Sequence, residues 1–441
     1  MIDERYLNDW SGTRYGTPLG IEVPKDTAAV ALILRACNAR AMPLAVQGGR
    51  TGVSGGAAPG EGETILSLEK LNQIDDFDRR GGVIVAGAGV LLEDLQRTVE
   101  AEGWFFPVDI GARGSCQIGG NVATNAGGSR VVKYGNVRDS VLGLEAVLAD
   151  GSVLGPPNRL VKNNAGYSLA SLLVGSEGTL GVVTRVAFRL IPLPPVRRTA
   201  LLAVASGVSI GMLLFECRAR LQEALSAFEV MWPDYVDEAL RVGAAGRKLP
   251  ATFAGRRAVL LEVEGSDDSA LGGTLEQCLM QLVEAGMLED VVLSSSARDA
   301  SSLWAIRESV GEIQAGIRPY VGFDLGMSAD AHDGFVDAAK ALLEKRIPEV
   351  RSFFFGHAGD GNLHAVVGPC PTPKYRETVE HALYSLMPSM VTSVTAEHGV
   401  GRKKKRYLSR SRSADDIRAM KALKRALDPN LILNPGRVLD M

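Results

Sequence analysis

Residues 46–56 read VQGGRTGVSGG, the first of three glycine-rich stretches in the N-terminal half of the chain. The second is GARGSCQIGGNVATNAGG at 111–128, and the third is GSEGTLG at 175–181. One such cluster is usually a turn between short strands. Three clusters before residue 182 favour a nucleotide site, because glycine lets backbone N–H groups approach and surround a pyrophosphate.

The common nucleotide-binding loops are missing from this region. No G-x-G-x-x-G follows a strand, and G-x-x-x-x-G-K-[ST] occurs nowhere in the sequence, which excludes the Rossmann and P-loop folds. The segments at 64–68, 82–90 and 145–154 have the pattern of short strands, and Asp150-Gly151 marks a hairpin turn. The sequence therefore predicts a nucleotide-binding fold of another kind.

The rest of the chain has the composition of an ordinary globular protein. Its 441 residues suggest two or three domains, with 46 % hydrophobic and 22 % charged residues. After PLPP at 192–195, which has the character of a linker, strand-like runs such as 258–265 alternate with amphipathic helices such as 275–286. This alternation predicts an α+β second domain built on an antiparallel sheet. A last helix should end before Asp428-Pro429.

Charge and cysteine content argue against several classes of protein. The formal net charge of -3 gives no reason to expect a nucleic-acid partner, and we interpret the basic block RKKKR at 402–406 as a solvated helix face or loop. Five scattered cysteines without a CxxC pair favour a reducing compartment. Without a signal-peptide pattern or a long apolar run, we expect a cytoplasmic protein, with peripheral membrane attachment left open.

Two of the five histidines flank a glycine-rich turn in FFFGHAGDGNLH at 353–364. The dipeptide Asp360-Gly361 favours a two-residue hairpin loop. Such a loop makes His357 and His364 direct cross-strand neighbours, with Cβ atoms roughly 4.5–5.5 Å apart. This spacing suits two ligands of one metal ion, and it suits two packed histidines as well.

The N-terminal half resembles the flavin-binding domain of the vanillyl-alcohol oxidase and p-cresol methylhydroxylase (PCMH) superfamily. The three glycine clusters, the third extended to KNNAGYSLASLLVGSEGTLGVVT, match its FAD-contacting segments in order. With HAGDGNLH, AEHGVG at 396–401 and LDPNLILNPGRV, they resemble the branch of D-2-hydroxyglutarate dehydrogenase, D-lactate dehydrogenase and the glycolate oxidase flavin subunit. The resemblance runs from residue 14 to 438, and six ordered motifs make chance agreement implausible.

The resemblance implies an α+β fold in three parts. A two-part PCMH-type FAD-binding domain at 14–195 should precede an antiparallel-sheet α+β domain for substrate and metal at 196–426. A C-terminal tail at 427–441 should pack back on the FAD domain and return to the flavin.

The resemblance also assigns the cofactor contacts. The first cluster should cradle the pyrophosphate, the second should lie along the flavin, and the third should approach the adenosine end or the ring. FAD should be non-covalent, because the first histidine is His332; attachment at Cys116 is an alternative. The predicted FAD-binding residues are Gly48, Gly49, Arg50, Thr51, Gly52, Gly55, Gly114, Ser115, Gly119, Gly120, Asn121, Asn125, Gly128, Glu177, Gly178, Gly181, Val183 and Asn434.

In the same resemblance, His357, His364 and Glu397 hold a divalent metal. Two imidazoles and one carboxylate leave open coordination positions and suit Zn²⁺, which we expect, or Mn²⁺ or Fe²⁺. His398 is then left for proton chemistry, because an imidazole near pKa 6.5 can accept a proton at neutral pH. The helix-borne His332 and His381 are interpreted as structural.

The predicted substrate-binding residues are Arg307, which matches the family position for the substrate carboxylate, and Asn362. The hydroxyglutarate branch carries a threonine and a lysine nearby, where this chain has Gly311 and Gly322. Part of the carboxylate clamp is therefore missing. We expect a substrate other than 2-hydroxyglutarate, such as lactate or a monocarboxylate with a bulkier apolar side chain.

These features predict an FAD-dependent dehydrogenase that oxidises a D-2-hydroxy acid to the 2-oxo acid. Electrons would pass to an electron-transfer flavoprotein, a quinone or a cytochrome, and a homodimer is left open. One alternative is a redox-neutral enzyme of the alkyl-dihydroxyacetonephosphate synthase type, whose run of consecutive histidines is absent here. Another is a nucleotide-binding protein with a structural metal and no catalysis.

Overall fold

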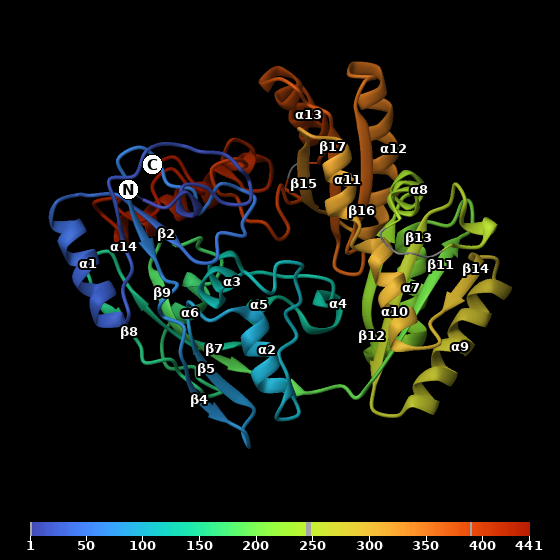
Figure 1. Ribbon diagram of the computed structural model, residues 1–441, viewed down its shortest axis with the longest axis horizontal. Helices are drawn as coiled ribbons and strands as arrows, with labels where there is room; N and C mark the ends of the chain where they lie inside the picture. The colour runs from blue at the N-terminus through green and yellow to red at the C-terminus, as the bar shows by residue number, and fades with distance from the viewer. Residues whose placement is uncertain (1, 244–247, 389) are drawn as a thin grey trace. The chain divides into compact units, whose positions relative to one another are not determined.

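The computed structural model describes residues 2–243, 248–388 and 390–441. The chain divides into two compact units, each with its own sheets and helices (Figure 1). Unit 1 contains the chain up to Gly128, Gly135–Leu193 and Glu397–Met441; unit 2 contains Ser129–Tyr134 and Pro194–Ala396.

Unit 1 is built on three sheets. A three-stranded parallel sheet has the order β1-β3-β2, a five-stranded antiparallel sheet has the order β4-β5-β9-β7-β8, and β10 pairs with β6. The strands are β1 (Gly20–Glu22), β2 (Leu44–Gln47), β3 (Thr64–Ser67), β4 (Ile74–Asp78), β5 (Val83–Gly87), β6 (Trp104–Phe105), β7 (Val141–Val147), β8 (Val153–Leu154), β9 (Val182–Arg189) and β10 (Ile191–Pro192).

Helices cover these sheets and bury two separate cores. Asp26 caps α1, whose Val30 and Leu34 pack against the parallel sheet. Side chains of α2 and α3 fill a second core on the antiparallel sheet. The helices of unit 1 are η1 (Glu4–Tyr6), α1 (Thr27–Ala39), α2 (Leu92–Glu100), α3 (Ile118–Thr124), α5 (Val137–Ser140), α6 (Leu169–Leu173), η4 (Lys405–Arg410) and α14 (Ala414–Leu427).

Unit 2 is built on one seven-stranded antiparallel sheet of order β14-β11-β13-β12-β16-β17-β15. Every residue of β12 is buried, which requires cover on both faces of the sheet at this central strand. The strands are β11 (Val196–Val204), β12 (Leu225–Met231), β13 (Ala258–Gly265), β14 (Leu288–Leu293), β15 (Val321–Gly326), β16 (Arg351–Gly356) and β17 (Asn362–Gly368).

Two groups of helices provide this cover. Side chains from α8, α10 and α11 share a core with alternate residues of the sheet, such as Leu201, Leu260 and Phe353. Helices α7, α9 and α12 pack together as the second group. The helices of unit 2 are α4 (Val131–Tyr134), α7 (Ile210–Leu221), η2 (Gln222–Ala224), α8 (Pro233–Val242), η3 (Ala251–Phe253), α9 (Asp268–Glu284), α10 (Ala297–Arg307), α11 (Val310–Gly316), α12 (Ala329–Arg346) and α13 (Pro373–Ser385).

The structure confirms the predicted mixture of helices with antiparallel sheets. The strand expected at 258–265 is β13, and the helix expected to end before Asp428 is α14. The basic block at 402–406 is less solvated than predicted, because Lys404 is only 7 % exposed. In the described part of the chain, no helix is long and apolar enough to cross a membrane.

The hairpin between β16 and β17 differs from the two-residue loop that the sequence predicted. Phe355 is the cross-strand partner of His364, and the Asn362 N–H donates to the His357 carbonyl. The turn therefore spans residues 358–361. Its Gly359 N–H donates to Phe228 on β12, a distant partner that local turn chemistry cannot reveal. The predicted direct pairing of His357 with His364 is wrong.

Candidate active site

The two histidines converge even though they are not opposite each other. His364 lies within β17 and His357 directly precedes the turn, and their ring centroids are 5.2 Å apart with an interplanar angle of 84°. His364 is buried and the His357 side chain is 12 % exposed. Unit 2 therefore brings both imidazoles to one place at the end of the hairpin.

Glu397 follows Ala396, whose position in unit 2 is fixed by hydrogen bonds. The Ala396 N–H and the Thr395 hydroxyl both donate to Asp324 Oδ2 on β15, at 3.1 and 2.7 Å. One ligand atom each from His357, His364 and Glu397 lies within 4.8 Å of the other two. Two imidazoles and one carboxylate at this spacing fit a divalent cation.

Glu229 on β12 is a site residue that the sequence analysis missed. Its Oε1 lies 2.7 Å from His357 Nδ1, and its Oε2 accepts from Arg307 Nε at 2.8 Å. Burial alone would raise the pKa of this carboxyl, but its partners His357 and Arg307 outweigh burial and lower it. One charged residue inside the apolar strand LSAFEVM is the signal that could have pointed to Glu229.

The two predicted substrate residues lie in the same unit. Arg307 ends α10, and its guanidinium carbon is 4.7 Å from the Phe355 ring centroid. Asn362 is 3 % exposed, and neither polar atom of its amide has a partner in the described part of the chain. A buried, unsatisfied amide costs about 1–3 kcal/mol, which favours a ligand group at this position.

Space remains where relatives of the hydroxyglutarate branch would carry longer side chains. A Cβ at Gly311, on α11, would meet no atom within 4 Å. A Cβ at Gly322, on β15, would first meet Tyr320 Cε2 at 3.9 Å. Both glycines are exposed and leave open space in unit 2.

The first two glycine clusters meet in unit 1. A Cβ at Gly49 would lie 2.2 Å from the Ser115 carbonyl oxygen, so this close approach requires glycine. A Cβ at Gly48 would be 3.5 Å from both Gln117 Oε1 and the Gly120 nitrogen, and one at Gly120 would meet nothing within 4 Å. Gln117 Oε1 is buried with no partner among the described residues. Open glycine backbone beside an unsatisfied amide fits the polar groups of FAD.

The third cluster joins the C-terminal tail. Asn434 accepts from the Val46 N–H at 2.8 Å and donates to the Glu177 carbonyl at 2.7 Å. The Glu177 carboxylate accepts from the backbone N–H groups of Val400 and Gly401, at 2.7 and 2.8 Å, while burial raises its pKa. The Glu177 side chain thus binds the AEHGVG segment, and its backbone N–H and carbonyl also have partners within the chain, Ala123 and Asn434.

The other predicted cofactor residues also lie in unit 1, and several have local partners. Arg50 donates to the Gly48 carbonyl at 3.2 Å, and Asn125 accepts from the Arg138 N–H at 3.1 Å. Burial raises the pKa of the Cys116 thiol, which accepts from the Asn121 amide at 3.6 Å. The remaining residues are Thr51, Gly52, Gly55, Gly114, Gly119, Gly128, Gly178, Gly181 and Val183.

His398, the predicted base, belongs to unit 1 as well. Its carbonyl oxygen accepts from the Ser54 hydroxyl at 3.1 Å, and the next carbonyl, of Gly399, accepts from the same hydroxyl at 2.9 Å. The AEHGVG segment is therefore attached to the first glycine cluster.

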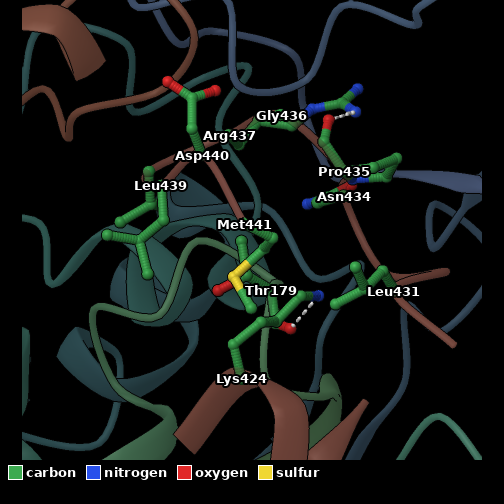
Figure 2. A pocket seen from close by; sticks show the side chains of 11 residues that line it. Thr179, Lys424, Leu431, Asn434, Pro435, Gly436, Arg437, Leu439, Asp440 and Met441 are labelled. Carbon is green, nitrogen blue, oxygen red and sulfur yellow. Dashed lines mark hydrogen bonds between the residues drawn. The ribbon is translucent and has the colours of Figure 1, made fainter. Parts of the chain in front are cut away.

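The tail lines a pocket in unit 1 with a volume of about 160 Å³. Figure 2 shows the side chains around it. Lys424 of α14 points to the Thr179 carbonyl at 2.8 Å, and Asn434 and Arg437 are also part of the lining. Small-molecule sites usually enclose about 300–1,000 Å³, so this pocket is too small for a dinucleotide. We do not assign it to the cofactor.

The sequence matches two family models in the order that the fold suggests. Residues 18–155 match the FAD binding domain, and residues 193–438 match the C-terminal domain of FAD linked oxidases. The chain therefore belongs to the FAD-linked oxidases and is a flavoprotein oxidoreductase that acts on CH–OH donors. This confirms the family resemblance inferred from the motifs.

Curated relatives match the chain along almost its whole length. The D-2-hydroxyglutarate dehydrogenase of Xanthomonas citri pv. viticola is 38% identical, covering 99% of this chain and 92% of the relative. The mitochondrial D-2-hydroxyglutarate dehydrogenase of Bos taurus is 40% identical, and the match covers 98% of this chain and 78% of the relative. A putative mitochondrial D-lactate dehydrogenase of Schizosaccharomyces pombe is 35% identical, covering 97% and 83%.

Solved structures support the fold. p-Cresol methylhydroxylase with substrate bound gives a TM-score of 0.77 at 17% identity, covering 96% of this chain and 89% of that chain. A structure of alkyldihydroxyacetonephosphate synthase gives a TM-score of 0.69 at 13% identity, covering 94% of this chain and 76% of that chain.

Proposed function

We propose that this protein is an FAD-dependent dehydrogenase that oxidises a D-2-hydroxy acid to the 2-oxo acid. The observation that carries the proposal is the cluster of His357, His364 and Glu397, linked through Glu229 to Arg307. A cation site next to a fixed arginine suits a substrate that has a hydroxyl beside a carboxylate. The names of the curated relatives support this substrate class.

The residues divide the chemistry among them. When bound, FAD supplies the hydride acceptor at N5, and a divalent cation supplies charge that stabilises an alkoxide. Arg307 binds and orients the substrate carboxylate, and the Asn362 amide provides a donor and an acceptor for it. His398 accepts the hydroxyl proton. Loss of this proton and of the C2 hydride leaves the carbonyl of the 2-oxo acid.

The cofactor and the metal are proposed with the residues predicted for them. FAD is held non-covalently by the three glycine clusters and Asn434, whose meeting in unit 1 supports the assignment. Zinc is the proposed metal, with manganese and iron as alternatives.

The substrate is proposed to be a monocarboxylate, either lactate or an acid with a bulkier apolar side chain. Glycine at positions 311 and 322 provides no side chain that could bind a second carboxylate. The relatives named D-2-hydroxyglutarate dehydrogenase make 2-hydroxyglutarate the competing substrate, so it belongs in every assay.

The electron acceptor is proposed to be a separate electron-transfer flavoprotein, quinone or cytochrome. We also keep the cytoplasm as the proposed location, although several eukaryotic relatives are named as mitochondrial. No nucleic-acid partner is proposed.

Two other functions are weighed against the dehydrogenase. The likeness to alkyldihydroxyacetonephosphate synthase concerns the fold alone, and the run of histidines expected for that type is absent. A non-catalytic protein with a structural metal would leave the buried Asn362 amide without a ligand. Both alternatives predict no reduction of a dye by a 2-hydroxy acid.

The test is an anaerobic titration of the purified protein with D- and L-2-hydroxy acids. We expect a flavin spectrum that a D-acid bleaches and its L-enantiomer does not. Acid denaturation of the same sample should release FAD into the supernatant, and flavin retained by the precipitate would contradict non-covalent binding. A flavin spectrum that no acid in the panel bleaches would overturn the proposed function.

A further inference from the structure

Glu229 is the one charged residue of the buried strand β12, LSAFEVM. All residues of β12 are buried, and Glu229 is 0 % exposed. A buried carboxylate costs several kcal/mol unless charged or hydrogen-bonded partners compensate it. Glu229 has such a partner on each oxygen, His357 on Oε1 and Arg307 on Oε2.

The bond to His357 selects the tautomer of the imidazole. With Nδ1–H directed at the Glu229 carboxylate 2.7 Å away, Nε2 carries the lone pair that can coordinate a cation. Carboxylates that bind the second nitrogen of a metal-binding histidine fix its ring and increase its basicity. This arrangement is the one that Glu229 and His357 show.

The bond to Arg307 fixes the guanidinium through Nε. The guanidinium also lies over the Phe355 ring, and this ring is 5.2 Å from the His364 ring at an interplanar angle of 36°. Arg307 and His364 thus share Phe355 as a packing surface, while Arg307 and His357 share Glu229. All of these contacts are within unit 2.

We propose that Glu229 is a positioning residue that couples the cation site to the substrate-carboxylate site. A single carboxylate orients a ligand imidazole with one oxygen and the substrate arginine with the other. The inference rests on the proposed function for the roles of His357 and Arg307. It adds that the affinities for cation and hydroxy acid depend on one side chain that touches neither.

The test compares Glu229→Gln with Glu262→Gln in the FAD-loaded full-length protein. Glu262 is a matched control, because it is also buried in the sheet and accepts from Arg130 at 2.6 Å and Trp304 at 3.1 Å. The probe is Zn²⁺ alone, measured by equilibrium dialysis without substrate. We expect Glu229→Gln to raise the Zn²⁺ Kd about 10–100-fold, the usual effect of losing such a partner. Glu262→Gln should leave the Kd unchanged.

Steady-state kinetics at saturating Zn²⁺ provide the second measurement. We expect Glu229→Gln to raise KM for the hydroxy acid, because Arg307 is less well fixed. A purely structural loss would lower the active fraction and hence apparent kcat, with KM unchanged. If Glu229→Gln does not fold, Glu229→Asp retains the charge but is too short for both bonds, and the same rise in Kd or KM is expected.

The proposal is overturned if a folded Glu229 variant has the same Zn²⁺ Kd as the wild-type protein, or if Glu262→Gln raises the Zn²⁺ Kd to the same extent. It is also overturned if the wild-type protein binds no Zn²⁺. The function fails separately, when no 2-hydroxy acid bleaches the wild-type flavin. If Glu229→Gln raises the Zn²⁺ Kd but no acid bleaches the wild-type flavin, the proposed function is rejected. The role of Glu229 at the cation site is then still supported.

Discussion

Glu397 and His398 are neighbours in the chain with different proposed roles. His357→Ala, His364→Ala and Glu397→Ala should each lower the bound metal and abolish turnover, because two remaining ligands hold a cation poorly. His398→Ala should keep metal and FAD but slow flavin reduction ~10²–10⁴-fold, with partial recovery at high pH, where hydroxide replaces the base. Metal analysis and anaerobic stopped-flow reduction provide the measurements. Equal metal loss in His398→Ala and His357→Ala would show that the two roles are assigned wrongly.

Gly311 and Gly322 are proposed to exclude a second carboxylate from the substrate. The double variant Gly311→Thr with Gly322→Lys should raise kcat/KM for 2-hydroxyglutarate relative to D-lactate. A new charge-assisted hydrogen bond is worth about 1.5–3 kcal/mol, roughly a 10- to 150-fold change in the ratio. Gly272→Thr, at another helical glycine with open space, is the control for folding. A wild-type protein that prefers 2-hydroxyglutarate would refute the argument.

His332 on α12 should make the protein sensitive to acid. It is 0 % exposed, and burial lowers its pKa to about 4. The unfolded chain, with a histidine pKa near 6.5, binds this proton first as pH falls. The contribution of His332 to the free energy of unfolding is thus complete above about pH 6.5. It is lost between about pH 6.5 and 4, by about 3 kcal/mol at most. Urea unfolding at pH 7 and 4.5 measures the difference in free energy of unfolding between the two pH values. His332→Phe should make this difference smaller, whereas His381→Phe, at an exposed position, should leave it unchanged.

Local sequence patterns determine some elements and not others. The strand β13 was predictable because its apolar run lies within the segment itself. The end of α14 was predictable because the stop signal, Asp428-Pro429, directly follows the helix. The β16–β17 turn was not, because its Gly359 bonds to Phe228 on β12. The role of Glu229 was hidden for the same reason, since both of its partners are remote in sequence.

Gly361 holds the turn that brings the two histidines together. Its φ is +86°, and a Cβ would lie 2.6 Å from the Met327 carbonyl oxygen. Gly361→Ala should therefore cost about 1–3 kcal/mol of unfolding free energy, measured in urea, and should weaken Zn²⁺ binding. Gly334→Ala is the control, because this helical glycine has open space around it. The change should raise the free energy of unfolding by about 0.5–1 kcal/mol. Unchanged stability and zinc affinity in Gly361→Ala would mean that the turn adapts.

The proposed cofactor and the proposed metal histidines lie in different units of the whole molecule. The glycine clusters and Asn434 are in unit 1, and His357 and His364 are in unit 2. The order of these motifs along the chain was readable from the sequence, since each motif is local. That residues 129–134 pack in unit 2, through Arg130 to Glu262 and Glu264, depends on contacts that no local pattern encodes.

Calorimetry can test whether FAD stabilises one of the two units. Each unit has its own hydrophobic core, so we expect two unfolding transitions. FAD at 100 times its Kd should stabilise unit 1, which contains every predicted FAD residue, by about 2.7 kcal/mol. For units of this size, about 2–4 °C per kcal/mol gives a shift of roughly 5–10 °C in one transition only. Removing FAD should lower the Tm of unit 1 and leave that of unit 2 unchanged. A single transition that moves with FAD would show instead that the molecule unfolds as one cooperative body.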